Sequence, residues 1–464
     1  MSYVYRLKSP VLSLPPMTIF WHRRDLRFSD NAGLYRALKT GDPVLPIFIF
    51  DRNILDKLPN QADVRVEFIQ QNVVELAEAY RAHGGGLRAY YGDPITIWRD
   101  IRDTLQPTAV YTNRDYEPYA IARDQAVKDL LAEQAIPFYD FKDHVIFESD
   151  EVQKQTGGPY TVYTPYRKTW QKVLESRMST YRGKDISFYL KPYPSEKYAE
   201  HLYQEDDPVA VPTLAAMGFE PTEIKIPPPS VPEDTLSHYH KTRDYPATTD
   251  GTSRLSHHLR HGTVSVRDWA HRALQKNETF LQELIWRDFY SNILQAFPRV
   301  VDEAYRREYD TIPWRNDEQD FQRWCKGRTG VPLVDAGMRQ LNAIGWMHNR
   351  VRMITSSYLV KHLLIDWRWG EGYFADKLLD YELASNNGGW QWAAGCGADA
   401  QPYFRIFNSA SQQTKFDKDY AYVRAWVPEY GTDEYPSEPM VGHEEGRDRA
   451  LKVYKTALMA AREA

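Results

Sequence analysis

The sequence predicts a doubly wound, parallel α/β domain, followed by a long connector and then an all-α domain. Two observations lead to this prediction. The chain has 464 residues, 42% of them hydrophobic, which is too long for one compact core. Short apolar runs alternate with amphipathic stretches over residues 17–141, whereas helical periodicity alone is found from about residue 230 onward.

Four buried strands are predicted from short runs of β-branched or aromatic residues with turn residues at their ends: 18–21, 44–50, 87–91 and 109–112. Helical spacing is found at 66–81, 95–104 and 121–134. This alternation predicts a parallel, Rossmann-like sheet, although the glycine fingerprint of dinucleotide-binding proteins is absent. Gly84-Gly85-Gly86 follows a predicted helix, so we interpret it as a helix stop rather than a phosphate-binding loop.

The domain boundaries are placed where the periodicity changes. Residues 1–16 are expected to form a flexible extension, with Met17 as a candidate functional start, and residues 17–141 form the α/β domain. Residues 142–211 form the connector, because Gly157-Gly158-Pro159 and Glu205-Asp206-Asp207-Pro208 interrupt any periodic pattern. Residues 212–464 form the helical domain, with helices predicted at 255–261, 266–276, 280–296, 321–326, 334–344, 350–364, 372–379 and 419–427.

The composition limits the classes of function. A net charge of −5 excludes a protein that is basic overall, so a nucleic-acid partner would have to bind a local patch. Cys325 and Cys396 provide neither a disulfide framework nor a metal-binding spacing, which favours a reducing cytoplasm and no metal. No apolar run reaches the roughly 18 residues that a membrane span needs. Aromatic residues make up 14% of the chain, which fits either an aromatic-rich core or a protein that binds flat ligands.

One predicted helix carries a mixed face. Glu283, Trp286, Arg287 and Tyr290 are spaced i, i+3, i+4 and i+7, so they lie on one side of the helix. A solvated face would not normally carry Trp and Tyr, and a core face would not carry Glu and Arg unless they were paired. The pattern favours a pocket that stacks one ring system and hydrogen-bonds another. A Glu–Arg pair beside ordinary core aromatics is the alternative.

A second segment, Trp346-Met347-His348-Asn349-Arg350-Val351-Arg352-Met353, places Asn349, Arg352 and Met353 on one face. Residues 339–361 contain four Arg or Lys residues and no Asp or Glu. This stretch either supplies phosphate contacts or is neutralised by Asp335, Asp366 or a distant acidic segment.

Two more segments are distinguished by their backbone. We interpret Asn386-Asn387-Gly388-Gly389-Trp390 as a tight turn whose glycines let a ligand approach the main chain. Gly251-Thr252-Ser253-Arg254-Leu255-Ser256 precedes a predicted helix. It supplies either a diphosphate site or a plain N-cap.

Taken together and in this order, these segments resemble the photolyase/cryptochrome family. The resemblance continues through Asp399-Ala400-Gln401-Pro402-Tyr403-Phe404-Arg405-Ile406-Phe407-Asn408 and includes the opening motif Trp21-His22-Arg23-Arg24-Asp25-Leu26-Arg27. It extends over the chain from about Met17 and is greatest to bacterial class I enzymes that repair cyclobutane pyrimidine dimers. The resemblance implies a carbon–carbon lyase in which light drives an electron from reduced FAD to a dimer flipped out of DNA.

The resemblance also implies that FAD is held in the helical domain. Its implied contacts are Tyr239, Thr252, Ser253, Arg254, Leu255, Ser256, Phe280, Arg287, Arg352, Asp380, Glu382 and Asn386. An Arg352–Asp380 pair would compensate charge on the reduced ring, and Asn386 would lie near its N5 atom. At position 382 the bacterial pattern commonly has Asp. The identity of a second, antenna chromophore is open. The Asn-Glu pair of folate-binding members is absent after Tyr116-Glu117, so a folate held in that way is not expected.

Cyclobutane dimers are the implied substrate because Glu283, Asn349 and Met353 match the dimer-contacting positions. Glu283 would donate a hydrogen bond to the base carbonyls, which requires a pKa raised by burial. Trp314, Trp367 and Trp390 match the family's electron-transfer chain. The implied DNA and lesion contacts are Arg243, Trp286, Tyr290, Asn349, Arg350, Met353, Trp392, Arg405 and Lys415.

Two other activities in the same family stay open. A cryptochrome would signal to a protein partner, and a (6-4) photolyase would repair the other ultraviolet photoproduct. In the pattern of the (6-4) enzymes, paired histidines occupy the positions that are Asn349 and Met353 in this chain. No long C-terminal extension is expected after residue 427, which favours repair over signalling. We expect a monomer whose partner is DNA containing cyclobutane dimers.

Overall fold

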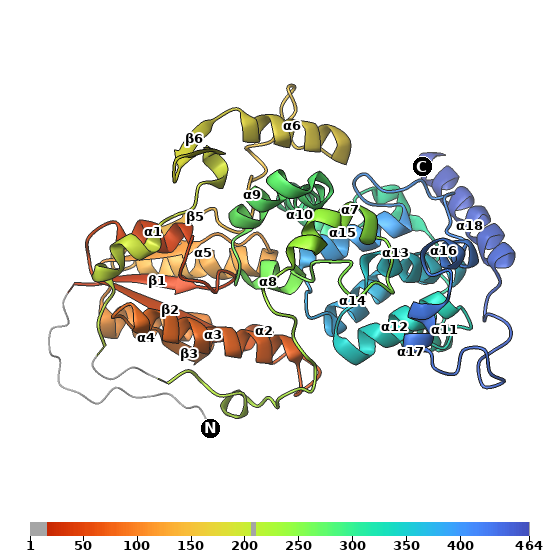
Figure 1. The fold of residues 1–464 in the computed structure, drawn as a ribbon, viewed down its shortest axis with the longest axis horizontal. Coiled ribbons are helices and arrows are strands. Elements are labelled where there is room, and N and C mark those ends of the chain that lie inside the picture. The colour runs from red at the N-terminus through yellow and green to blue at the C-terminus, as the bar shows by residue number, and fades with distance from the viewer. Residues whose placement is uncertain (1–15, 206–209, 464) are drawn as a thin grey trace.

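The computed structural model describes residues 16–205 and 210–463. Nearly all of the extension predicted for residues 1–16 therefore lies outside the described residues, as do Asp206, Asp207 and Pro208 of the acidic stretch. The α/β domain and the helical domain lie side by side (Figure 1).

Five parallel strands form the predicted sheet. They are β1 (Thr18–His22), β2 (Val44–Asp51), β3 (Arg88–Gly92), β4 (Ala109–Asn113) and β5 (Phe138–Phe141), in the spatial order β3-β2-β1-β4-β5. The helices of this domain are α1 (Ala32–Leu38), α2 (Arg52–Leu55), α3 (Val64–Ala82), α4 (Pro94–Leu105) and α5 (Pro118–Ala132). The strand order reverses between β1 and β4, so a switch point lies at their carboxyl ends. The predicted doubly wound fold is confirmed.

Local chemistry explains where these elements begin and which of them the sequence did not predict. The side chains of Asn31, Asp63 and Asp93 each accept a backbone N–H in the first turn of α1, α3 and α4. The predicted helix stop is also confirmed, since α3 ends at residue 82 and Gly84 has a φ of +83°. Strand β5 and helices α1 and α2 were not predicted, because β5 is a four-residue edge strand with partly exposed side chains and the two helices have only seven and four residues.

The connector contains regular structure that the sequence did not predict. Helix α6 (Tyr163–Glu175) is followed by an antiparallel hairpin of β6 (Met178–Tyr181) and β7 (Lys184–Ser187). The buried residues of α6 are Tyr163, Tyr166, Trp170 and Leu174, at the spacing of one helix face. Two 3₁₀ segments follow in the connector, η1 (Phe188–Leu190) and η2 (Ser195–His201), and a third, η3 (Ala215–Met217), lies just after it.

The second half is helical, as predicted, and the described residues after Ser187 contain no strand. Its elements up to the middle are α7 (Glu233–Thr242), α8 (Ser256–His261), α9 (Val266–Lys276), α10 (Glu278–Ala296), η4 (Pro298–Val301), η5 (Arg307–Thr311), α11 (Glu318–Cys325) and α12 (Pro332–Ile344). They continue with α13 (Asn349–Ser357), a π-helical turn η6 (Tyr358–His362), α14 (Trp367–Lys377), α15 (Leu383–Ala394), α16 (Ser409–Phe416), α17 (Ala421–Trp426) and α18 (His443–Glu463). Within the described ranges, no helix combines the length and the apolar character needed to cross a bilayer.

One local interpretation is wrong. Asn386-Asn387-Gly388-Gly389 is not a tight turn but part of helix α15. The reason is packing: a Cβ at Gly388 would lie 2.2 Å from the Tyr290 ring, so glycine lets α15 approach α10 closely. Helix α15 ends only at Gly395, whose φ is +89°.

Candidate functional site

The mixed face of α10 lies against the first turn of α6. The Trp286 ring stacks on Tyr163, with ring centroids 3.6 Å apart and planes 6° from parallel. Tyr290 tilts against the same indole at 5.5 Å. The Tyr163 hydroxyl donates a hydrogen bond to the Gln282 carbonyl at 2.9 Å, which fixes the orientation of the stack. Sequence reasoning missed Tyr163 because its partner is more than a hundred residues away along the chain.

The acid of this face is paired with an arginine from another segment. Glu283 accepts a hydrogen bond from Arg243, just after α7. Burial raises the pKa of Glu283 even though the Arg243 charge opposes that change. The raised pKa agrees with the protonated role expected for this side chain. Glu283 is thus part of a Glu–Arg pair, as in the alternative interpretation, but its partner comes from another segment, because Arg287 binds Glu382 instead.

Asp244 connects Arg243 to the second predicted segment. Arg350 Nη2 donates to Asp244 Oδ1 at 2.6 Å, and Arg243 Nε lies 3.8 Å from the same oxygen. Arg350 Nη1 is 3.9 Å from the Met353 sulfur. Glu283 and Met353 are therefore joined through one chain of contacts. Sequence reasoning did not single out Asp244, although its position beside Arg243 was a signal.

The positive stretch at residues 339–361 is largely neutralised. Arg339 pairs with Glu429 at 2.6 Å, Arg350 with Asp244 and Arg352 with Asp380 at 2.9 Å. The neutralising groups come from distant segments rather than from Asp335 or Asp366 as direct partners. Phosphate contacts at Arg243 or Arg350 would therefore have to compete with carboxylates already in place.

Arg352 and Asp380 form the pair that the sequence led us to expect. Arg352 Nη2 donates to both Asp380 oxygens, at 3.1 and 2.9 Å, while its Nε donates to the Met347 carbonyl at 2.7 Å. Asn349 begins α13 one turn earlier with an exposed side chain. On α15, the Asn386 amide donates to the Glu371 carboxylate at 2.9 Å. Burial raises the pKa of Glu371.

Glu382 lies in an ion-pair network between the two domains. Its Oε1 accepts hydrogen bonds from three segments, at 2.8 Å from Arg24 and at 2.9 Å from Arg287 and His144. Burial alone would raise the pKa of Glu382, but the Arg287 charge and the His144 hydrogen bond lower it well below the usual range. Burial and two arginine charges lower the pKa of His144 to about 3, so its contact with Glu382 is a hydrogen bond from a neutral ring.

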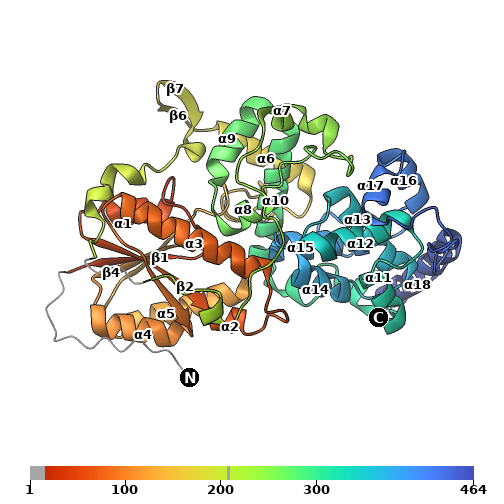
Figure 2. The same cartoon turned by 60° about the horizontal axis from the view of Figure 1, so that its bottom comes forward.

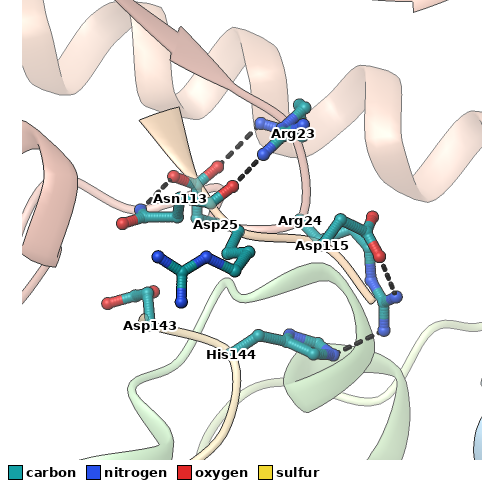
Figure 3. A pocket seen from close by; sticks show the side chains of 8 residues that line it. Arg23, Arg24, Asp25, Asn113, Asp115, Asp143 and His144 are labelled. Carbon is teal, nitrogen blue, oxygen red and sulfur yellow. Dashed lines mark hydrogen bonds and ion pairs between the residues drawn. The ribbon is translucent and has the colours of Figure 1, made fainter. Parts of the chain in front are cut away.

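The same network fills the switch point of the sheet. Figure 3 shows Arg23, Asp25 and Asn113 at the carboxyl ends of β1 and β4, with Arg24, Asp115 and His144 beside them. The cavity there has a volume of about 10 Å³, close to what one water molecule needs. Glu117, of the Tyr116-Glu117 motif, binds Arg24 at 2.9 Å, and burial raises its pKa to about 7.

The predicted tryptophan chain lies in the largest core of the helical domain. Trp390 and Trp367 are each 2% exposed, and Trp314 is partly exposed at the edge of the same cluster. Trp390 and Trp367 are therefore buried alike, and Trp314 is the one of the three that is partly exposed. Trp324, which sequence reasoning did not single out, lies 6.0 Å from Trp390.

The hydroxyl-rich turn before α8 has no plain N-cap. Leu255 stands at the N-cap position without a side-chain capping bond, so the first-turn N–H groups of α8 are free of such a bond. Arg254 has a φ of +49° and stacks on Trp346, 4.4 Å from the ring centroid. The Leu255 side chain is buried in the core, as is that of Phe280, which contacts Tyr239 edge to face at 5.1 Å.

The remaining predicted DNA contacts are Trp392, Arg405 and Lys415. Trp392 is one turn beyond Gly388 on α15, and its ring centroid is 6.4 Å from that of Phe407. Arg405 and Lys415 are exposed, and Lys415 lies over the Phe416 ring that Arg350 also covers. The structure thus brings Glu283, Arg350 and Met353 into one chain of contacts beside the rings of Trp286 and Tyr290, and Lys415 lies next to Arg350 over the Phe416 ring.

Known proteins resemble this chain over nearly its whole length. The family model for DNA photolyase matches residues 18–183, and that for the FAD binding domain of DNA photolyase matches residues 280–432. A deoxyribodipyrimidine photo-lyase of Vibrio cholerae is 35% identical over 478 residues, covering 95% of this chain and 100% of its own length. A class III photolyase structure from Agrobacterium tumefaciens has a TM-score of 0.80 at 32% identity, covering 97% of this chain and 99% of the other. A cryptochrome structure from Synechocystis has a TM-score of 0.81 at 26% identity, covering 95% and 99%.

Proposed function

The chain belongs to the DNA photolyase family, and from this premise we infer that it is a deoxyribodipyrimidine photo-lyase. It is an FAD-dependent carbon–carbon lyase that uses light to split cyclobutane pyrimidine dimers in DNA. The observation that carries this inference is the face on which a partly buried Glu283 with a raised pKa lies beside the Trp286 stack. A flipped dinucleotide needs both an aromatic surface and a hydrogen-bond donor for its carbonyls.

The residues present fit a flavin dinucleotide. The free N–H groups and hydroxyls at the start of α8 suit a diphosphate. The Arg352 guanidinium, held by Asp380, suits the electron-rich edge of the ring. The Asn386 amide can donate or accept a hydrogen bond, and its hydrogen bond to the Glu371 carboxylate holds it in place. We propose that these residues, with Arg287 and Glu382 at the domain boundary, hold the cofactor.

When bound, reduced FAD supplies under near-ultraviolet or blue light the electron that opens the cyclobutane ring. The protein residues bind and orient the substrate for that event. Trp286, backed by Tyr163, and Trp392 would flank the flipped bases and exclude water. Glu283, in its protonated form, would donate a hydrogen bond to a base carbonyl where negative charge develops. Asn349 and Met353 would contact the dimer from α13.

The tryptophan chain has a separate role in the proposal. Trp390, Trp367 and Trp314 would carry electrons from the protein surface to oxidised FAD. Their common cluster and the partial exposure of Trp314 support this path. Repair itself would not depend on the chain once the cofactor is reduced.

We also propose a substrate, an oligomeric state and a cellular location for the enzyme. DNA containing pyrimidine dimers is the substrate that fits the family. We propose that the enzyme acts as a monomer in a reducing cytoplasm, which agrees with two free, buried cysteines, Cys325 and Cys396. Size-exclusion chromatography with light scattering would test the monomer.

The cryptochrome and (6-4) alternatives are distinguished by one assay. The reduced protein is incubated under blue light with two oligonucleotides, one carrying a cyclobutane dimer and the other a (6-4) photoproduct. We expect restored thymines from the first oligonucleotide, none from the second, and none in the dark. Restoration from the (6-4) substrate alone, or from neither with FAD bound and reduced, would contradict the proposal.

A further inference from the structure

The segment from α6 through β7, residues 163–187, extends along the periphery of the molecule. We call it the α6–β7 arm. In Figures 1 and 2 its hairpin projects beyond α9 and away from both domains. One face of α6 is packed on α10, where the Trp170 indole donates to Asp288 at 3.0 Å and the Asn292 amide donates to the Tyr166 hydroxyl at 2.7 Å. The α6 part of the arm is therefore attached to the helix that carries Glu283 and Trp286.

The arm is also strongly basic. In a chain with a net charge of −5, this short segment contains only two acidic residues, Glu175 and Asp185. Its basic residues are Arg167, Lys168, Lys172, Arg177, Arg182 and Lys184. All but Arg167 are exposed, and Arg167 is partly exposed.

These cations differ from the others near the site in lacking partners. Arg243, Arg350 and Arg352 are each paired with a carboxylate. Across the described ranges, no carboxylate lies within 4.0 Å of any of the six arm cations. Arg177 instead lies over the exposed Phe188 ring at 3.7 Å, and Arg182 is held at the hairpin tip with a φ of +50°. An unneutralised basic track is the electrostatic feature that a phosphate backbone binds.

The position of these basic residues relative to Trp286 indicates what they bind. α6 begins at Tyr163, which stacks on Trp286, and its 13 residues run outward from that stack. A helix of this length spans roughly 20 Å. Along the axis of a duplex, each strand carries one phosphate about every 3.4 Å, so a helix parallel to that axis extends over the rise of about six phosphates of one strand.

We propose that the α6–β7 arm is a second DNA-binding surface, which holds the phosphate backbone of the duplex on one side of the flipped lesion. This proposal rests on the proposed function. Since phosphate contacts carry no base or lesion information, the arm adds affinity for damaged and undamaged duplex alike. Lesion recognition stays with the α10 face, and the arm sets which flank of the site must be double-stranded DNA.

The test is the double variant Lys168→Ala/Lys172→Ala in the full-length, FAD-containing protein. Arg99→Ala/Lys128→Ala is the matched control, because it removes two exposed cations from α4 and α5 of the α/β domain. Removing one phosphate-binding cation should reduce the slope of log affinity against log salt by about 0.9. When two such cations are removed, wild-type affinity should fall about 12-fold more than that of the arm variant as salt increases from about 50 to 200 mM. The control should follow the wild type.

A second measurement uses the direction of the arm. Two dimer-containing duplexes are compared, one extended by about ten base pairs on the 5′ side of the lesion and the other on the 3′ side. The arm variant should lose affinity for one of them only, while its FAD content and its repair yield at saturating protein stay at the wild-type level. Unchanged salt slope, or equal losses on both duplexes, would overturn the proposal. If the wild type itself neither binds nor repairs dimer-containing DNA, the proposed function fails instead.

Discussion

Replacing Gly388 with alanine should separate α15 from α10 and disturb the packing of Tyr290 and Trp286. The new methyl group would lie 2.2 Å from Tyr290 Cδ1 and 2.4 Å from its Cε1, against an ordinary contact of 3.4 Å or more. The Tyr290 ring would therefore have to move by more than an ångström. Tyr290 is also in contact with Trp286, so the displacement would reach the stack with Tyr163.

The expected magnitude follows from two opposing effects. Overpacking of this severity costs about 3 kcal/mol, the upper end of the usual range. Removing a glycine from a helix interior stabilises by about 1 kcal/mol. The net loss of about 2 kcal/mol corresponds to a Tm lower by about 4–8 °C for a domain of this size.

Gly372→Ala is the matched control. Gly372 lies inside α14, which packs beside α15, and a Cβ there would meet no atom within 4 Å. This variant should gain only the helix stabilisation, raising Tm by about 1–4 °C. Calorimetry and a binding assay with dimer-containing DNA would measure both variants. The reasoning is refuted if the two variants shift Tm in the same direction, or if Gly388→Ala binds dimers as tightly as the wild type.

Three further outcomes are expected. Repair should decline as the pH rises through the raised pKa of Glu283, because the donating acid form is then lost, and Glu283→Gln should remove this dependence in a pH–yield profile; a wild-type profile without such a decline would count against the proton donor. Arg352→Ala leaves the Asp380 carboxylate without its cation, so the purified protein should have at least about tenfold less FAD by absorbance, whereas Arg352→Lys should retain more; full FAD content in the alanine variant would disprove the charge role. Trp390→Phe should block photoreduction of oxidised FAD, followed by absorbance, yet spare repair by chemically reduced enzyme; repair lost under both conditions would contradict the electron path.

Much of the site could be predicted because its signals are local. The i, i+3, i+4, i+7 spacing of Glu283, Trp286, Arg287 and Tyr290 fixes their common face whatever packs against it. The order of the motifs identified the family, and the comparisons confirmed it together with FAD as the cofactor. The individual roles of these residues stay predictions.

Other features could not be predicted because they depend on partners far along the chain. Glu283 is paired with Arg243 rather than with Arg287 on its own helix, since Arg287 is held by Glu382. The glycines at 388 and 389 indicated a turn, but they lie inside helix α15, where the Tyr290 ring leaves no room for a Cβ at position 388. Local sequence gives a residue's intrinsic backbone freedom, not the neighbour that makes use of it.

The sequence by itself determined the strand–helix alternation, the helical second half and the residues of the α10 face, because each depends on a period of two or 3.6 residues within one segment. Only the tertiary structure decided which charges are neutralised. Arg350 and Arg352 pair with carboxylates on other segments. Lys168 and Lys172 have no carboxylate partner among the described residues and are exposed on the α6–β7 arm. The physical reason is that Coulomb interactions depend on distance in space, which the order of residues along the chain does not specify.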